Sequence, residues 1–222
     1  MNYGFYSIEG LPGLGKSTVL KKLDKSFVMM KEIPEEAKKV KRKRKFKNRL
    51  EKIRYDNEWY LARELERIKR AKGTKKNVTI FDRCIYSQIA HNFANDKMHG
   101  TEELFRLFSR LIELENNGLA LTMKIIYLKA TPDFSIKRRL QRGRGDEVRK
   151  VKTKAEGWHT TDFLEYAKQA YEKIVAVLHN NAITISVPRQ QKNMDFLINK
   201  YVNKTRDKKF DVSITKIREL FL

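Results

Sequence analysis

The chain has 222 residues, 41% of them hydrophobic, and 49 Lys and Arg outnumber 27 Asp and Glu to give a formal net charge of +22. A chain of this length buries roughly 70% of its unfolded surface and needs no disulfides to form a core. The single cysteine, Cys84, excludes a disulfide framework and a cysteine-rich zinc site. No apolar run approaches the ~20 residues of a membrane helix, and the N-terminus lacks a signal-peptide pattern. We expect an intracellular, cytoplasmic protein with no membrane partner.

Predicted strands and helices alternate along almost the whole chain. In chain order they are a strand at 3–8, a helix at 16–25, a strand at 27–33, a helix at 56–71, a strand at 78–81, helices at 86–95 and 102–116, a strand at 124–128, helices at 132–142 and 161–179, a strand at 183–187, a helix at 191–202 and an amphipathic tail at 213–222. This alternation indicates a parallel sheet that is covered on both faces. Because no repeat or Gly/Ser linker interrupts it, the sequence predicts one α/β domain over 1–222 with a five-stranded parallel sheet.

The segment between the first strand and the first helix fits the phosphate-binding pattern G-x-x-x-x-G-K-[ST], the P-loop. Its residues are Gly10, Leu11, Pro12, Gly13, Leu14, Gly15, Lys16 and Ser17, followed by Thr18. Glycines let backbone N–H groups turn inward around a phosphate, and the following helix presents its positive end to it. Lys16 is expected to hold the β- and γ-phosphates of ATP, and Ser17 to bind Mg²⁺. An ordinary glycine-rich turn is the alternative, which the position between strand and helix disfavours.

Asp82 closes the predicted strand at 78–81, and Arg83 follows it. In P-loop proteins a carboxylate at the carboxyl end of a strand helps to place Mg²⁺ and its waters. A strand-end acid or a helix cap is the alternative for Asp82, and the P-loop in the same chain favours the metal role. Arg83 is expected to point at the same crevice.

Arginines gather at the end of the helix predicted at 132–142, beside two glycines. Arg138 and Arg142 lie four residues apart on one helix face, and Arg144 stands between glycines. This combination suits a lid, at about 138–157, that closes on a transferring phosphoryl group. Taken alone, the residues fit a solvated basic helix slightly better.

Acidic residues follow the second predicted strand, in the order Glu32-Ile33-Pro34-Glu35-Glu36. Because strand carboxyl ends face the ligand crevice of an open parallel sheet, a carboxylate here could accept a proton from a substrate hydroxyl. An acidic helix N-terminus fits the same residues, and the sequence leaves both interpretations open.

Together these motifs resemble the deoxynucleoside kinase and thymidylate kinase superfamily of P-loop nucleoside and nucleotide kinases. The matching pieces span residues 5 to about 187 and are Ile8-Glu9-Gly10 with Gly15-Lys16-Ser17-Thr18, Pro34-Glu35, Asp82-Arg83-Cys84-Ile85-Tyr86-Ser87, Arg138 with Arg142-Gly143-Arg144 and Asp146-Glu147, and Phe163-Leu164-Glu165-Tyr166. The P-loop alone is common to a large superfamily. The Asp-Arg-x-x-Tyr-Ser and Arg-Gly-Arg pieces narrow the resemblance to these kinases. The resemblance implies a P-loop kinase fold with a small arginine-bearing lid.

The resemblance also implies roles for single residues. Glu35 would be the base that activates the acceptor hydroxyl, Arg83 would hold the 5′ end of the acceptor or its phosphate, and Glu147 would contact the sugar. The lid arginines would be Arg138, Arg142 and Arg144. Family enzymes transfer the γ-phosphoryl group of ATP with Mg²⁺ and are often dimers through a helix pair, so a homodimer is implied.

The acceptor is expected to be a deoxynucleoside or its monophosphate. Thymidylate kinases usually carry an acidic residue where this chain has Pro12, which favours a deoxynucleoside kinase, with thymidine-type acceptors first and thymidylate kinase as the alternative. The glutamine that often reads the base in deoxynucleoside kinases is missing from the helix at 56–71. Candidates there are Trp59, Tyr60, Arg63 and Arg67. Arg63, Arg67 and Arg70 share one face of this helix, and with Arg83 they would suit a phosphate clamp.

The charge of +22 also suits polyanions. A P-loop ATPase or a polynucleotide 5′-kinase is therefore the alternative from another class, and a degenerate P-loop binding module is a third. If the protein is a small-molecule kinase, its basic surface is expected to bind nucleic acid nonspecifically, in addition to the nucleoside or nucleotide acceptor. The basic run at 38–47 is expected to be a solvated surface that catalysis does not need, and the extension at about 204–222 matches neither kinase pattern.

Overall fold

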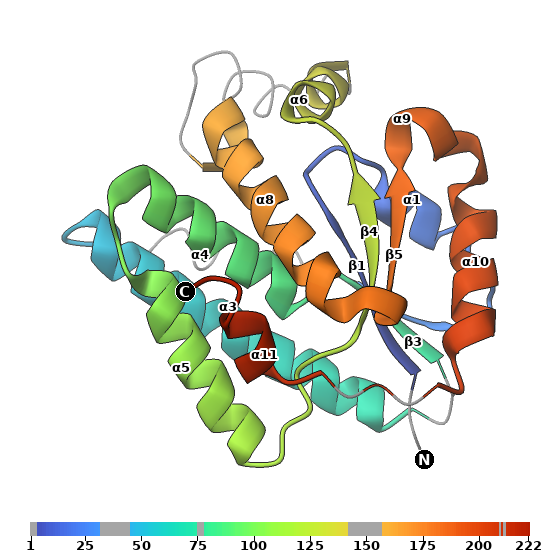
Figure 1. The fold of residues 1–222 in the computed structure, drawn as a ribbon, viewed down its shortest axis with the longest axis horizontal. Coiled ribbons are helices and arrows are strands. Elements are labelled where there is room, and N and C mark those ends of the chain that lie inside the picture. Colours follow the sequence, from blue (N-terminus) through green and yellow to red (C-terminus); the bar gives the residue numbers. More distant parts are fainter. Residues whose placement is uncertain (1–3, 32–44, 75–77, 142–156, 209, 211) are drawn as a thin grey trace.

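The computed structural model describes residues 4–31, 45–74, 78–141, 157–208, 210 and 212–222 (Figure 1). At its centre lies a five-stranded, all-parallel sheet with strand order β2-β3-β1-β4-β5. The strands are β1 Gly4–Gly10, β2 Val28–Met30, β3 Val78–Asp82, β4 Lys124–Lys129 and β5 Ala182–Ser186. The predicted α/β class and the number of strands are confirmed.

Helices connect the strands in the predicted alternation. They are α1 Lys16–Leu20, α3 Arg49–Lys72, α4 Ile85–His99, α5 Glu103–Asn116, α6 Pro132–Gln141, α8 Thr161–Leu178, α9 Val187–Gln190, α10 Met194–Thr205 and α11 Ile214–Arg218, with short 3-10 turns η1 Gly157–His159, η2 His179–Asn181 and η3 Gln191–Asn193.

The start of α3 differs from the prediction, which placed it at Asp56. Asn48 is the N-cap, because its side-chain oxygen accepts a hydrogen bond from the backbone N–H of Glu51 at 2.9 Å. Asp56 lies inside the helix and forms an ion pair with Lys52, one turn earlier.

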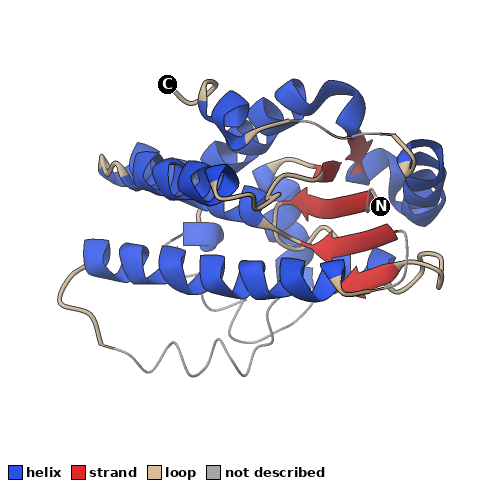
Figure 2. Ribbon diagram, turned by 90° about the horizontal axis from the view of Figure 1, so that it is seen from below, coloured by secondary structure: helices blue, strands red, loops and turns tan. Residues whose placement is uncertain are grey.

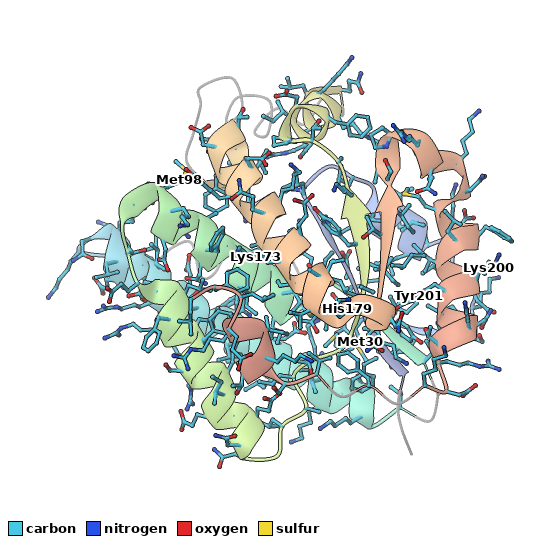
Figure 3. The ribbon with its side chains drawn as sticks, in the orientation of Figure 1. Met30, Met98, Lys173, His179, Lys200 and Tyr201 are labelled. Carbon is cyan, nitrogen blue, oxygen red and sulfur yellow. The ribbon has the colours of Figure 1, made fainter. Side chains whose placement is uncertain are left out.

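The two faces of the sheet carry different helices, and β1 shows which. Successive side chains of a strand point to opposite faces. The hydroxyl of Tyr6 lies 2.9 Å from that of Thr205 on α10, whereas Glu9 accepts a hydrogen bond from Ser87 on α4. Therefore α10 covers one face and α4, with its close neighbour α8, covers the other; Figure 2 shows helices on both sides of the strands. In Figure 3, Tyr201 lies on the sheet side of α10 and Lys200 on its outer side.

The strand register brings the chemistry-bearing segments to one edge of the sheet. Ile8 in β1 lies opposite Asp82 in β3, and Gly10 lies opposite Leu128 in β4. Because all strands are parallel, the P-loop after β1 and Arg83 after β3 emerge side by side at the carboxyl edge. The central strands are almost completely buried. Of the described helices, none has both the length and the apolar character needed to cross a membrane.

Candidate active site

The P-loop joins β1 to α1 and is held rigidly by its surroundings. The side chains of Leu11 and Leu14 are fully buried, and the carbonyl of Pro12 accepts a 2.6 Å hydrogen bond from the hydroxyl of Ser135 on α6. Gly13 has φ +83°, and a Cβ there would lie 2.8 Å from Cγ of Arg139, also on α6. Only glycine fits this close approach with a positive φ. The loop is therefore set in its shape by core packing and by α6.

Lys16 lies across this loop. Its Nζ donates hydrogen bonds to the backbone carbonyls of Gly10 and Leu11, both at 2.8 Å, and the residue is only 6% exposed. The ammonium group is thus held at the mouth of the loop by neutral acceptors. Phosphate oxygens are stronger acceptors for a charged donor than carbonyls, so an entering phosphate would gain this contact at little conformational cost.

Ser17 and Asp82 meet beside the loop, as the sequence predicted for a metal site. The Ser17 hydroxyl donates to Oδ2 of Asp82 at 2.7 Å. Asp82 is buried, and its Oδ1 has no hydrogen-bond partner among the described residues. Hydroxyl and carboxylate oxygens are ligands that Mg²⁺ prefers, and Mg²⁺ takes its other ligands from water and phosphates. This donor set fits Mg²⁺, and no cluster of three His, Cys, Asp or Glu side chains occurs elsewhere in the described ranges.

Fully buried Glu9, on the sheet face that α4 covers, is the hub of a hydrogen-bond network. Its Oε1 accepts from the Ser7 hydroxyl and from the backbone N–H of Cys84, the latter at 2.8 Å. Its Oε2 accepts from the Ser87 hydroxyl at 2.6 Å, and Ser87 lies 2.9 Å from the hydroxyl of Tyr171 on α8. Burial raises the pKa of Tyr171. The hub fixes the start of α4 and the inner face of α8 relative to β1.

Arg83 leaves β3 in a strained backbone conformation. Its φ is +64°, a region that costs a non-glycine residue roughly 1–2 kcal/mol, and its N–H donates to the carbonyl of Ile8 at 3.2 Å. The guanidinium donates to the Ser87 hydroxyl at 3.2 Å and lies 5.6 Å from the centre of the Trp158 ring. The structure therefore brings Arg83 to the edge that carries the P-loop and the Ser17–Asp82 pair.

Arg67 takes a different position from Arg83. Its two terminal nitrogens donate to the backbone carbonyls of Met30 at 2.8 Å, Asp82 at 3.1 Å and Arg83 at 3.0 Å, and it pairs with Glu64. The guanidinium therefore ties the ends of β2 and β3 together. This arrangement makes Arg67 a positioning residue for the crevice, where the sequence predicted a substrate contact.

Other residues predicted on α3 have different partners from Arg67. Arg63 forms an exposed ion pair with Glu66 at 2.9 Å and lies over the Trp59 ring, and Tyr60 packs edge to face with Trp59. Of the arginines predicted as a phosphate clamp, Arg67 and Arg83 meet through the Arg83 carbonyl, whereas Arg63 pairs with Glu66.

Glu64 is a buried acid that the sequence analysis missed. Only 2% of the residue is exposed, and its Oε1 has no hydrogen-bond partner in the described part of the chain. Burial raises the pKa of Glu64 to about 7, although the nearby Arg67 opposes the shift. A charged residue on the inner stripe of α3, at the spacing of Leu61 and Ile68, was the available signal.

Gln88, on α4, was also missed. Its side-chain Oε1 is buried and has no hydrogen-bond partner in the described ranges. One turn later, Asn92 exchanges hydrogen bonds of 2.7 and 2.9 Å with Asn57 on α3, so Gln88 lies on the α4 face that turns towards α3. It directly follows Ser87, which was the available sequence signal.

Arg138 lies on the α1 side of the P-loop. Its Nη1 donates to Oε1 of Gln191 at 2.7 Å, and its guanidinium stacks over Phe134. It borders a small cavity of about 90 Å³ whose walls include Gly15, Thr18 and Met194. The other predicted site residues, Glu35, Arg142, Arg144 and Glu147, fall outside the described residues, as does most of the predicted lid.

Comparisons with known proteins agree on one family. The model of the deoxynucleoside kinase family matches residues 6–208, whereas a search of curated proteins finds no significant match. Among solved structures, deoxyadenosine kinase from M. mycoides with the products dCMP and dCDP is similar, with 22% identity, a TM-score of 0.66, and coverage of 90% of this chain and 99% of that chain. The structure of the same kinase with dATP has 20% identity and a TM-score of 0.65, and the match covers 90% of this chain and 100% of that chain. The structure with dCTP has 21% identity and a TM-score of 0.61, and the match covers 90% of this chain and 99% of that chain.

Proposed function

The chain belongs to the deoxynucleoside kinase family, and from this premise we propose that it transfers the γ-phosphoryl group of Mg-ATP to the 5′-hydroxyl of a deoxynucleoside. One observation carries the proposal. Lys16 in the P-loop, the Ser17–Asp82 pair and Arg83 all stand at one edge of the sheet, where the register of β1 and β3 places them. This grouping supplies donors for phosphates, ligands for a metal and a cation for the acceptor side.

The donor nucleotide would occupy the P-loop and the cavity next to it. Its phosphates would replace the two carbonyls that Lys16 now contacts. Ser17 and Asp82 would hold Mg²⁺, which when bound neutralises charge on the β- and γ-phosphates. The cavity between Thr18, Arg138 and Gln191 adjoins the loop, so we place the ribose or base of ATP there. In this arrangement Arg138 acts on the donor.

The acceptor would lie between α3 and α4, with its 5′ end next to Arg83. Arg83 is already oriented by Ser87 and by the Trp158 ring. We retain Glu35, in the segment that follows β2, as the base that takes the proton of the 5′-hydroxyl. Arg142 and Arg144 are retained as lid residues and Glu147 as the sugar contact, on the resemblance alone.

Gln88 is our candidate for reading the base. Its buried, unpartnered Oε1 faces the α3 side of α4, and a buried acceptor gains most from a ligand that supplies the missing donor. The exocyclic amino groups of adenine and cytosine are such donors. The similar structures hold dATP, dCTP and dCMP. These observations favour deoxyadenosine and deoxycytidine over the thymidine-type acceptor that the sequence suggested.

The proposal is tested by incubating the protein with γ-labelled ATP, Mg²⁺ and each of the four deoxynucleosides. We expect labelled 5′-monophosphates, with deoxyadenosine and deoxycytidine as the best acceptors, and none without Mg²⁺. Gln88→Ala should lower kcat/KM for these two acceptors by ~10-fold or more, the cost of about one buried hydrogen bond, and leave KM for ATP unchanged. Absence of any labelled monophosphate would contradict the proposed function. A preference for thymidine that Gln88→Ala leaves intact would contradict only the assignment of the base.

Nonspecific nucleic-acid binding is a separate proposal that rests on the net charge of +22. It predicts DNA binding whose affinity falls steeply with salt and is the same in the wild type and in Lys16→Ala. DNA binding that depends on Lys16, with transfer of label to a 5′ end, would instead indicate a polynucleotide kinase.

A further inference from the structure

Arg139 is a buried arginine in the last turn of α6 to which the proposed reaction gives no role. Only 3% of the residue is exposed. Arginine is rarely buried unless it is paired, so the partners of Arg139 indicate what it holds in place. In Figure 1, α6 lies beside the start of α8, and the two helices are in contact.

The aliphatic part of the Arg139 side chain packs on the P-loop. A Cβ at Gly13 would lie 2.8 Å from Cγ of Arg139 and 3.5 Å from its Cδ, so this part of the side chain lies directly against the Gly13 backbone. Ser135, one turn earlier on α6, holds the same loop through its hydrogen bond to the carbonyl of Pro12. The P-loop and this part of α6 are therefore packed as one unit.

The guanidinium of Arg139 contacts the turn η1, which precedes α8. Its Nη1 donates to the backbone carbonyl of Trp158 at 2.6 Å, and its Nη2 lies 2.5 Å from Nδ1 of His159. Because arginine has donors only, Nδ1 of His159 is the acceptor, and the proton of this imidazole is on Nε2. Two hydrogen bonds from a charged donor thus hold η1 against α6.

Trp158 connects this contact to Arg83. The guanidinium of Arg83 lies 5.6 Å from the centre of the Trp158 ring. The ring also packs edge to face with Phe163, 5.2 Å between ring centres, and lies 5.8 Å from the ring of His91. Since an indole ring attracts a cation placed over it, the position of Trp158 helps to decide where the guanidinium of Arg83 lies. Printed contacts therefore run from the P-loop through Arg139 and Trp158 to Arg83.

We propose that Arg139 is a positioning residue, which holds Trp158, and through Trp158 the guanidinium of Arg83, in a fixed place relative to the P-loop. This role rests on the proposed reaction, in which the P-loop binds the phosphates of ATP and Arg83 meets the 5′ end of the deoxynucleoside. Transfer requires donor and acceptor to be held in line. Loss of the two hydrogen bonds of Arg139 should therefore impair use of the acceptor and leave the binding of ATP intact.

The test compares Arg139→Met with the wild type. Methionine keeps an unbranched chain against Gly13 and removes both hydrogen bonds to η1. The matched control is Lys137→Met, which removes the same charge from an exposed position on the same helix. Kinetics with ATP and deoxyadenosine give kcat and the two KM values, and cooperative urea unfolding shows whether each variant is folded.

We expect Arg139→Met to lower kcat/KM for deoxyadenosine at least ~10-fold, because a small displacement of reacting groups can cost about 100-fold, and to leave KM for ATP unchanged. Lys137→Met should match the wild type. Arg139→Met should add little to the effect of Trp158→Leu, because the arginine acts through this ring, and a double-mutant cycle measures that coupling. Arg139→Lys keeps the charge without the planar fork. It should show the same changes to a smaller degree, and it takes the place of Arg139→Met if that variant does not unfold cooperatively.

Tryptophan emission reports the place of Trp158 without turnover. The chain has two tryptophans, so in a Trp59→Phe background all tryptophan emission comes from Trp158. There, Arg139→Met should move the emission to longer wavelength, because the released indole meets more water, and Lys137→Met should not.

Four results would overturn the proposal: an Arg139→Met variant as active as an active wild type, an equal rise in KM for ATP and for deoxyadenosine, full additivity with Trp158→Leu, or unchanged emission. A wild type that phosphorylates no deoxynucleoside would contradict the proposed function instead. In that case the emission still decides whether Arg139 holds Trp158.

Discussion

Replacing Arg67 by Met separates two roles that the sequence and the structure assign to this residue. The Arg67 side chain is 11% exposed and that of its partner Glu64 is 3% exposed. Breaking a buried pair by removing one partner costs about 3–5 kcal/mol, because the other charge remains buried. Three backbone carbonyls at the ends of β2 and β3 also lose their donor. Since these losses share one side chain, we expect about 3–5 kcal/mol in total, a large part of the stability of a typical domain.

The assay is urea unfolding of the wild type, Arg67→Met, Glu64→Gln and the double variant. Glu64→Gln removes the charge that Arg67→Met leaves unpaired, so the double variant should be more stable than the sum of the two single losses predicts. Arg63→Met is the matched control, because its ion pair with Glu66 is exposed and should contribute less than about 1 kcal/mol. An unchanged urea midpoint for Arg67→Met, with a raised acceptor KM, would refute the positioning role and restore the predicted substrate contact.

Three further predictions concern single groups. Lys16→Ala should lower kcat at least ~100-fold with an unchanged unfolding midpoint, because in the proposed reaction this lysine stabilises charge that develops on the phosphates; near-normal turnover would contradict this role. Glu35→Gln should lower kcat far more than it raises acceptor KM, since a base acts in the transition state; a silent variant would place the base elsewhere. The pKa of Glu64 is raised from 4.5 to about 7, so the folded state retains a proton that the unfolded chain releases. This stabilisation is complete below pH 4.5 and is lost as pH rises to about 7. The free energy of unfolding, measured with urea, should therefore fall across this range by up to about 3 kcal/mol, but not in Glu64→Gln.

The sequence predicted the features that depend on local pattern. Strand and helix alternation gave the parallel sheet, and the Gly10–Ser17 motif lay between β1 and α1 where it was placed. The Ser17–Asp82 contact at 2.7 Å follows from the order of β1 and β3 in a P-loop sheet. These elements are specified by residues close together in the chain or by a topology that the motif itself implies.

Features that depend on tertiary packing escaped the sequence analysis. The arginines of α3 look alike in the sequence. Arg67 is buried because the ends of β2 and β3 approach it and accept its hydrogen bonds, whereas Arg63 stays exposed. Gln88, which we propose reads the base, was overlooked because a base-reading residue was sought on α3 alone. At the C-terminal end, the ring of Phe221 packs against those of Phe93 and Phe108, which lie far from it in the chain.

The central claim is that a deoxynucleoside, rather than its monophosphate, accepts the phosphoryl group. The most direct test is the ratio of kcat/KM for deoxyadenosine to that for its 5′-monophosphate, both with saturating Mg-ATP. In the structure the guanidinium groups of Arg63, Arg67 and Arg83 each already have an acceptor within the protein. We therefore expect the nucleoside to be favoured by at least ~10-fold, about 1.4 kcal/mol in transition-state binding. A kcat/KM that favours the monophosphate by a similar factor would contradict the account and identify a nucleotide kinase.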